Sequence, residues 1–296
     1  MRNVCNECRN PRMRQIHSNN ITGEILKSGF IAIALATLAV IHPASAAPVR
    51  EVVLAGDVEW EALNPARGDA GPQAATLWGD RKGPVATGFL ARFVDGFSSP
   101  PHIHNATYRA VVISGSIHND DPAAAHLWMP PGSFWTQPKG EAHITAAKGP
   151  ANVALVEIDR GPYLVKPIEE AYDSGERPIN VDARNIVWVD PPGMPATATG
   201  PKLAYLWGSL DEGQSNGTFV RLPAGFAGAI HSHGTTFRAV LIKGQARYLG
   251  DDMKTLEPGS YFGSSGDTVH GLALDPGMAS TIYVRTDGRY EIVPEK

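Results

Sequence analysis

The sequence predicts an all-β protein that contains two tandem barrels or sandwiches of similar build. Short runs rich in β-branched and aromatic residues recur along the chain, and clusters of Gly, Pro, Asn and Asp separate them. Beyond residue 46, no segment carries a sustained helical stripe of useful length. The pattern of one half also returns in the other, and 296 residues suffice for two domains of ordinary size.

Residues 1–46 are expected to form a secretory signal peptide. Five basic side chains precede the apolar run FIAIALATLAVI at 30–41, and Ala44-Ser45-Ala46 has the small-x-small pattern of a cleavage site. A membrane anchor is the alternative, but this run extends only about 18 Å as a helix, against a hydrocarbon core of about 30 Å. We therefore expect a periplasmic or secreted protein that has no stable membrane span after cleavage.

The composition of residues 47–296 excludes several classes of function. Both cysteines, Cys5 and Cys8, precede this segment, so it has no thiol for a disulfide, a metal or catalysis. Its net charge is about −7 and it has no basic cluster, which argues against nucleic acid as a partner. The sequence also lacks the fingerprints of serine hydrolases, phosphate loops and dinucleotide-binding domains.

The two halves of the chain repeat each other. The tripeptide LWG at 77–79 returns at 206–208, an offset of 129 that also relates His102 to His231. Beyond residue 132 the offset is 127, so the second copy has lost two loop residues. An internal duplication follows, and each copy has the size of a domain.

The repeat predicts an N-terminal domain at 47–175 and a C-terminal domain at 176–296. The polar stretch at 170–180 lacks strand alternation and is expected to be the linker. By side-chain parity Arg109 and Arg238 face away from the barrel interiors, and we expect them to form ion pairs between strands or domains. The expected strands are VATGFLARFV, YRAVVISG, AAHLWMP, GSFWTQP and ANVALVEI in the first copy, then GTFVRLP, FRAVLIKG, QARYLG, GSYFGS and STIYVRT in the second.

The histidines of each copy have the spacing of metal ligands. In a strand His102 and His104 share one face with their β-carbons about 7 Å apart, so both imidazoles can bind one cation if a neighbouring strand supplies a third ligand. His143 is the candidate for that ligand. Six of the ten histidines occupy matching positions, which favours ligation over the alternative of unrelated surface or core histidines. The matching trio of the second copy is His231, His233 and His270.

These positions resemble the two sequence motifs of the cupin family. The C-terminal copy repeats both motifs, from Gly225 to Gly244 and from Gly259 to His270. The resemblance spans essentially the whole of 47–296 and implies a bicupin, two tandem jelly-roll barrels of the double-stranded β-helix type. More narrowly, the chain looks like an uncharacterised group of exported bacterial double cupins. In the first copy the motifs read Gly96-x5-His102-x-His104-x3-Tyr108-x6-Gly115 and Gly132-x5-Pro138-x-Gly140-x2-His143.

Two departures from the cupin pattern bear on the chemistry. Cupins of the oxalate-oxidase and decarboxylase kind carry Glu as a fourth ligand, where this chain has Tyr108 and Phe237. In the second motif of the C-terminal copy, Ser265 and Asp267 stand where Pro and Gly are expected. Asp267 lies an odd step of three before His270, so we interpret it as a turn former and not as a ligand.

Tyr108 and Gln137 are the candidate catalytic residues. Tyr108 lies an even step of four beyond His104, so it is expected to face the same cavity, where its phenol could orient or protonate a ligand. Simple packing of the ring is the alternative, and it explains the exchange for Phe237 in the second copy. Trp135 and Gln137 could line the mouth of the cavity, although barrel packing accounts equally well for the aromatic ring.

Three neutral imidazoles favour a redox-active divalent metal. They leave the ion its full charge and up to three open positions, two for a chelating substrate and one for dioxygen, as in the similar 2-His-1-carboxylate iron sites. The favoured cofactor is therefore Fe(II), with Zn, Mn, Cu or Ni also compatible, and the favoured function is oxygenation of a small organic substrate. The N-terminal site is the better candidate for activity because its second motif is complete.

Two other functions fit the same residues. Zinc held by three histidines and water would generate hydroxide for hydrolysis. A non-catalytic cupin that binds a small molecule fits as well, because this fold hosts many functions. A homodimer is compatible with the exposed sheet edges of jelly rolls.

Overall fold

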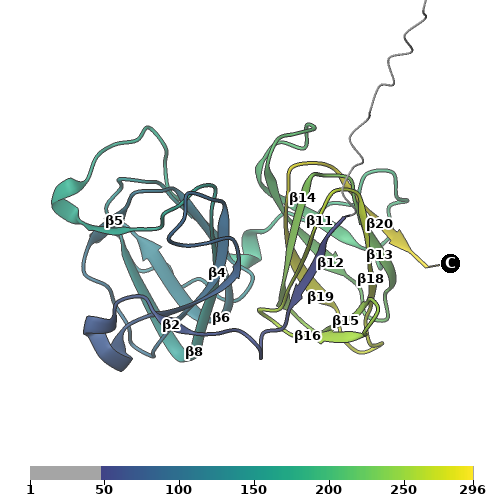
Figure 1. Ribbon diagram of the computed structural model, residues 1–296, viewed down its shortest axis with the longest axis horizontal. Coiled ribbons are helices and arrows are strands. Elements are labelled where there is room, and N and C mark those ends of the chain that lie inside the picture. The colour runs from purple at the N-terminus through teal and green to yellow at the C-terminus, as the bar shows by residue number, and fades with distance from the viewer. Residues whose placement is uncertain (1–47, 296) are drawn as a thin grey trace, which may run out of the picture. The chain divides into compact units, whose positions relative to one another are not determined.

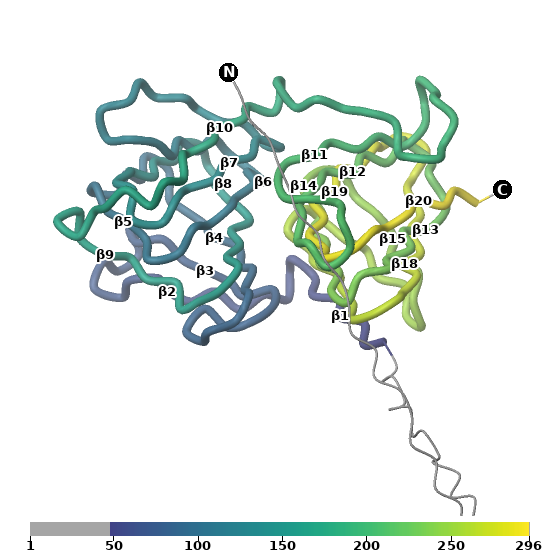
Figure 2. Tube along the Cα trace, turned by 90° about the horizontal axis from the view of Figure 1, so that it is seen from above, coloured from purple at the N-terminus to yellow at the C-terminus, as the bar shows by residue number. Residues whose placement is uncertain are grey.

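The computed structural model describes residues 48–295, and the strands that it contains form two barrels (Figures 1 and 2). All of the pairings between these strands are antiparallel, which confirms the all-β expectation. The predicted signal peptide and both cysteines lie outside the described residues. No helix within 48–295 is long and apolar enough to cross a membrane. The helical segments of the described residues are three short 3-10 turns, η1 (Pro65–Ala70), η2 (Ile168–Glu170) and η3 (Ala183–Asn185).

The N-terminal barrel consists of a seven-stranded sheet and a two-stranded ribbon. The sheet has the order β10-β7-β6-β8-β4-β3-β2, and β5 pairs with β9 in the ribbon. The bounds are β2 (Glu61–Ala62), β3 (Gln73–Trp78), β4 (Thr87–Phe93), β5 (His102–His104), β6 (Tyr108–Asp120), β7 (Phe134–Gln137), β8 (Ile144–Ile158), β9 (Val165–Pro167) and β10 (Ile179–Val181).

The C-terminal barrel consists of two facing sheets. Their strand orders are β1-β17-β14-β19-β12-β11 and β16-β15-β18-β13-β20. The bounds are β1 (Arg50–Val53), β11 (Lys202–Gly208), β12 (Asn216–Leu222), β13 (Ala227–Ser232), β14 (Thr236–Lys243), β15 (Ala246–Leu249), β16 (Lys254–Leu256), β17 (Tyr261–Ser265), β18 (Thr268–Ala273), β19 (Ser280–Thr286) and β20 (Tyr290–Pro294).

Two strands pair with the barrel on the other side of the predicted boundary between residues 175 and 176. The first strand, β1, lies at the edge of the C-terminal sheet, where it pairs with β17 and appears in Figure 1 as a purple strand among green and yellow ones. Conversely, β10 follows the boundary but pairs with β7 of the N-terminal sheet. The sequence division therefore separates the two copies of the repeat, whereas the hydrogen bonds assign one strand from each side to the other barrel.

Three apolar clusters form the core. One fills the N-terminal barrel around Val112 and Trp135, and a second fills the C-terminal barrel around Leu241 and Phe262. The third contains residues of both barrels and joins their sheets. Full burial of a Leu or Phe side chain contributes about 1.5–3 kcal/mol, so this shared layer is a major source of cohesion between the barrels. Its members include Leu90, Phe134 and Leu155 of the first barrel and Phe219, Val240 and Tyr283 of the second.

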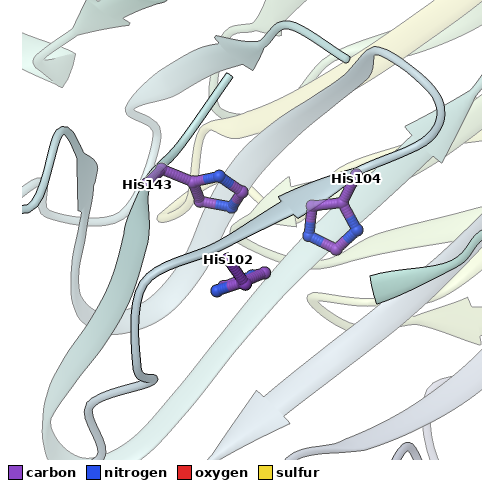
Figure 3. Close-up of side chains that lie close together, drawn as sticks. All are labelled: His102, His104 and His143. Atoms are coloured by element: carbon purple, nitrogen blue, oxygen red, sulfur yellow. The ribbon is translucent and has the colours of Figure 1, made fainter. Parts of the chain in front are cut away.

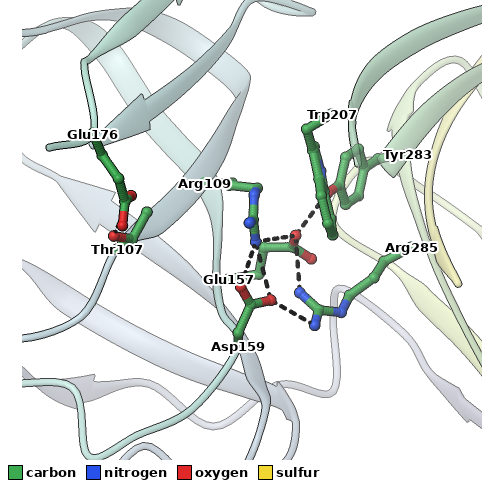
Figure 4. A network of polar contacts seen from close by, with 8 residues as sticks. All are labelled: Thr107, Arg109, Glu157, Asp159, Glu176, Trp207, Tyr283 and Arg285. Atoms are coloured by element: carbon green, nitrogen blue, oxygen red, sulfur yellow. Dashed lines mark hydrogen bonds and ion pairs between the residues drawn. The ribbon is translucent and has the colours of Figure 1, made fainter. Parts of the chain in front are cut away.

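A buried carboxylate lies within the contact between the barrels (Figure 4). Glu157 is 1 % exposed and accepts hydrogen bonds from the hydroxyl of Tyr283 at 2.8 Å and from Arg285 at 3.2 Å. Asp159 binds Arg285 at 2.7 Å and Arg109 at 3.0 Å. Arg109 also stacks on Trp207, with its guanidinium carbon 3.7 Å from the ring centre. The expected structural role of Arg109 is thereby confirmed.

Two matching glycines lie on the long strand of each copy: Gly115 is within β6, where its pairing is irregular, and Gly244 directly follows β14. Gly115 and Gly244 both have positive φ, at 74° and 86°. A β-carbon on Gly115 would lie 2.1 Å from Oδ1 of Asn152, and one on Gly244 would lie 2.4 Å from the carbonyl oxygen of Ala279. Only glycine satisfies both the conformation and the close approach.

Candidate metal centre

The structure brings the first histidine trio together at one side of the N-terminal barrel (Figure 3). His102 and His104 are the ends of β5, and His143 directly precedes β8. The backbones of His102 and His143 exchange two hydrogen bonds of 3.0 Å, so their side chains share one face. One ring nitrogen from each of the three lies within 4.8 Å of the others. The predicted cluster His102, His104 and His143 is therefore present.

The backbone orients all three imidazoles. Nδ1 of His102 lies 2.9 Å from the carbonyl oxygen of Pro100, and Nδ1 of His104 lies 3.1 Å from that of Leu164. Nδ1 of His143 lies 3.3 Å from the carbonyl oxygen of Glu141. A carbonyl only accepts, so each Nδ1 donates its hydrogen and each Nε2 carries a lone pair. This is the arrangement in which histidines present Nε2 to a metal.

Burial keeps the three imidazoles neutral. Desolvation lowers the pKa of His104 well below its usual value, and the nearby His143 and His102 add to this effect. Desolvation, together with the neighbouring His102, lowers the pKa of His143 to about 3. The pKa of His102 is also lowered, again chiefly by burial. Metal binding requires neutral imidazoles, so the ligand set needs no loss of protons near neutral pH.

Tyr108 lies beside this cluster, as its parity predicted. Its hydroxyl donates to Oδ1 of Asn119 at 2.8 Å and lies 3.4 Å from Nε2 of His143. Burial raises the pKa of Tyr108 to about 12, although the polar groups of Trp135, Thr145 and Asn119 around its hydroxyl act in the opposite direction. The phenol therefore keeps its hydrogen across the physiological pH range, and a ligand can accept it in place of Asn119, whose Oδ1 also accepts from Thr145.

Gln137 has a different position from the one expected. It is buried but does not line the cavity; its Oε1 accepts from Nδ2 of Asn119 at 2.9 Å and its Nε2 donates to the carbonyl oxygen of Glu141 at 3.2 Å. The same carbonyl receives the hydrogen of His143. Gln137 thus supports the side chains around the site from behind and has no direct access to a ligand.

The sequence analysis missed Asn119 and Tyr163. Asn119 is an odd step from Tyr108 along β6, but the pairing of β6 with β8 is irregular between Val112 and Ser116, and Asn119 accepts the hydrogen of the Tyr108 hydroxyl on the same face. Tyr163 stacks on His104 with ring centres 4.5 Å apart, and its hydroxyl lies 3.3 Å from Nε2 of that histidine. The match of Tyr163 with Tyr290 in the repeat was the one sequence signal for its importance.

A cavity of about 430 Å³ opens beside the histidines. Its walls are mostly apolar and aromatic, and the indole Nε1 of Trp135 is buried there without a hydrogen-bond partner. Arg67 of η1 lies at the same cavity and contributes a positive charge. The volume suits a small organic molecule. The apolar and aromatic lining includes Leu63, Pro72, Phe89, Phe93, Phe97, Trp135, Val156, Tyr163 and Leu164, and the polar lining includes Asn64, Arg67, Ser99, His102, His104, Tyr108 and Thr145.

The second predicted trio is wrong. His270 points into the C-terminal barrel, where Tyr248 lies 2.8 Å from its Nδ1 and Ser264 lies 3.0 Å from its Nε2. His231 and His233 lie instead on the outer face, beside the carboxylate of Asp267. The grouped residues of this copy are therefore His231, His233 and Asp267, and His270 is not one of them.

A one-residue difference in register explains this correction. In the N-terminal barrel His102 is directly opposite His143, whereas in the C-terminal barrel His231 is opposite Val269 and His270 is opposite Ile230. A shift by one residue turns a side chain to the other face of a sheet. Ile230 and Ser232 consequently point inward where the first barrel has its histidines, and both are fully buried.

Comparisons with known proteins identify the fold. The profile of a family described as a domain of unknown function (DUF4437) matches residues 51–293. No curated protein matches the chain. Among solved structures, a candidate dioxygenase from Nostoc punctiforme is 15 % identical, with 81 % of this chain and 82 % of that chain covered and a TM-score of 0.62.

Two further solved structures are similar. Salicylate 1,2-dioxygenase from Pseudoaminobacter salicylatoxidans, determined with gentisate, is 15 % identical, with 88 % of each chain covered and a TM-score of 0.53. Oxalate decarboxylase from Bacillus subtilis is 13 % identical, with 81 % of this chain and 78 % of that chain covered and a TM-score of 0.50. These similarities show the fold and confirm two tandem cupin barrels.

Proposed function

We propose that this chain, which belongs to the DUF4437 family, is a metal-dependent oxygenase that acts on a small organic substrate. The observation that carries the proposal is the neutral trio His102, His104 and His143 beside an apolar cavity, with every Nδ1 hydrogen-bonded to a carbonyl. Fe(II) is the favoured metal, because three such ligands leave positions for a chelating substrate and for dioxygen; when bound, the metal would activate dioxygen, with the electrons drawn from the substrate.

The residues of the cavity suggest how a substrate would be held. The indole Nε1 of Trp135 is a buried donor without a partner, so it can donate to an oxygen atom of the substrate. The hydroxyl of Tyr108 can do the same if its hydrogen turns from Asn119 to the substrate. The aromatic walls favour a flat apolar body and exclude water from it. Arg67 favours a carboxylate at the outer end. We therefore propose a small aromatic or apolar acid as the substrate class.

We also propose that the protein works outside the cytoplasm. This proposal rests on the apolar run at 30–41 and the small residues at 44–46 of the sequence. In that setting the substrate would be an imported or exported small molecule.

Metal analysis of tag-free protein tests the ligand set. We expect iron in the purified protein, or after anaerobic loading with Fe(II), and its loss by about one equivalent per chain in His102→Ala and His143→Ala. His126→Ala is the matched control, because His126 is an exposed histidine of the same barrel that lies outside the trio. Unchanged iron in both site variants would show that the trio is not a ligand set.

Oxygen consumption tests the chemistry separately. Anaerobic Fe(II)-loaded protein would be mixed with catechols, diketones, hydroxyacetophenones and hydroxybenzoic acids in an oxygen electrode. We expect uptake with at least one class, and its loss in His143→Ala but not in His126→Ala. Bound iron with no uptake for any class would refute the oxygenase and favour a binding protein or a hydrolase.

A further inference from the structure

The outer face of the C-terminal barrel carries a second group of metal-ligating side chains. His231 lies on β13 between Val269 of β18 and Glu291 of β20, and its side chain points to the solvent side of the sheet. His233 follows two residues later on the same side. This group is separate from the barrel interior, where His270 makes its own hydrogen bonds to Tyr248 and Ser264.

A single carboxylate lies between the two imidazoles. Oδ1 of Asp267 is 2.7 Å from Nε2 of His231, and Oδ2 is 2.9 Å from Nδ1 of His233. The two ring centres are 4.2 Å apart, and one potential ligand atom from each residue lies within 4.8 Å of the others. The group therefore converges on one point without any rearrangement of the backbone.

The turn that presents Asp267 is fixed by the backbone. Gly266 has a φ of 72° and its N–H donates to the carbonyl oxygen of Thr235 at 3.0 Å. The hydroxyl of Thr268 donates to the carbonyl oxygen of Gly266 at 3.2 Å. Ser265 and Asp267, which depart from the cupin pattern, thus build a turn that holds a carboxylate over the two histidines. The same turn therefore accounts for the departure from the cupin motif and for the position of the Asp267 carboxylate.

We propose that His231, His233 and Asp267 form a second divalent-metal site, on the outer face of the C-terminal barrel and independent of the first. Two imidazoles and one carboxylate suit zinc, with water in the fourth position. Each half-exposed imidazole can move its hydrogen through solvent to its other ring nitrogen, so the two nitrogens that now face Asp267 become ligands. The metal would connect β13 to the turn between β17 and β18.

Zinc titration of tag-free protein, stripped with a chelator, tests the site. The background is the double variant His102→Ala/His143→Ala, so that the first site does not contribute. We expect this protein to bind one equivalent of Zn²⁺ by calorimetry, and to melt at a higher temperature when Zn²⁺ is added. Adding Asp267→Asn, or His231→Ala, should abolish both effects. Asp251→Asn is the matched control on an exposed turn of the same barrel, and it should retain them.

The outcomes separate this proposal from the oxygenase. Absence of saturable Zn²⁺ binding in the double variant overturns the second site and leaves the first untouched. Retained binding in both Asp267→Asn and His231→Ala also overturns it, because the metal would then lie elsewhere. Because Asp267 and His231 are at the surface, the metal-free variants should melt within a few degrees of their parent, which checks that lost binding is not unfolding.

Discussion

Replacing Tyr108 by Phe tests whether its hydroxyl serves the site or only the packing. The second copy carries Phe237 at the matching position, fully buried, so the ring alone fills the space. The substitution removes the 2.8 Å hydrogen bond to Asn119, whose Oδ1 keeps the hydroxyl of Thr145 at 2.7 Å. Because no acceptor is orphaned, the free energy of unfolding should fall by only about 1 kcal/mol.

The effect of Tyr108→Phe on oxygen consumption should be larger than its effect on stability. A hydrogen bond to a charged oxygen contributes about 1.5–3 kcal/mol, which corresponds to a loss of about 10- to 150-fold in kcat. The iron content should not change, because the trio is intact. Tyr248→Phe is the matched control, since Tyr248 is a buried tyrosine hydrogen-bonded to a histidine in the other barrel. Activity within twofold of the parent in both variants would refute a role for the Tyr108 hydroxyl.

Three further predictions address other parts of the molecule. Glu157→Gln leaves Arg285 with Asp159 as its only close carboxylate, so the free energy of unfolding in urea should fall by about 3 kcal/mol. A loss below about 1 kcal/mol would contradict a tightly coupled contact between the barrels. Arg67→Gln should raise KM for acidic substrates several-fold and leave the metal content intact, whereas an equal KM for an acid and its amide would count against the charge. Gly115→Ala should lower the melting temperature by several degrees, because its β-carbon would meet Asn152 at 2.1 Å; an unchanged melting curve would contradict this.

The sequence was sufficient for the fold and the first histidine trio because both depend on local rules. Strand alternation placed His102 and His104 on one face, and the repeat supplied His143. Prediction was wrong where one residue of register decided the result: β13 pairs so that His231 is opposite Val269, which turns the second pair of histidines outward. Asn119 was not predicted for a related reason: the irregular pairing of β6 with β8 changes which face of the sheet its side chain occupies. Register depends on pairing partners that no single strand specifies.

Strand membership also followed long-range contacts. The repeat predicts where the two copies lie in the sequence, but it could not indicate that β1 and β10 would each pair across the predicted boundary. An edge strand has unpaired backbone N–H and C=O groups, and it can pair with any strand that lies beside it in the folded molecule. Gln137 shows the same limit for a side chain, because its partners Asn119 and Glu141 are defined only after the sheet has closed.

The place of β1 has a consequence for how the molecule is assembled. Tyr261 of β17 binds the carboxylate of Glu51 in β1 across 210 residues of chain, so the C-terminal sheet remains open at one margin until the earliest strand returns to it. Contacts of such long range form late and slowly. A C-terminal fragment beginning at residue 176 would leave β17 as a bare template for other chains, and separate expression of the halves should yield aggregates unless residues 50–53 are supplied as a peptide.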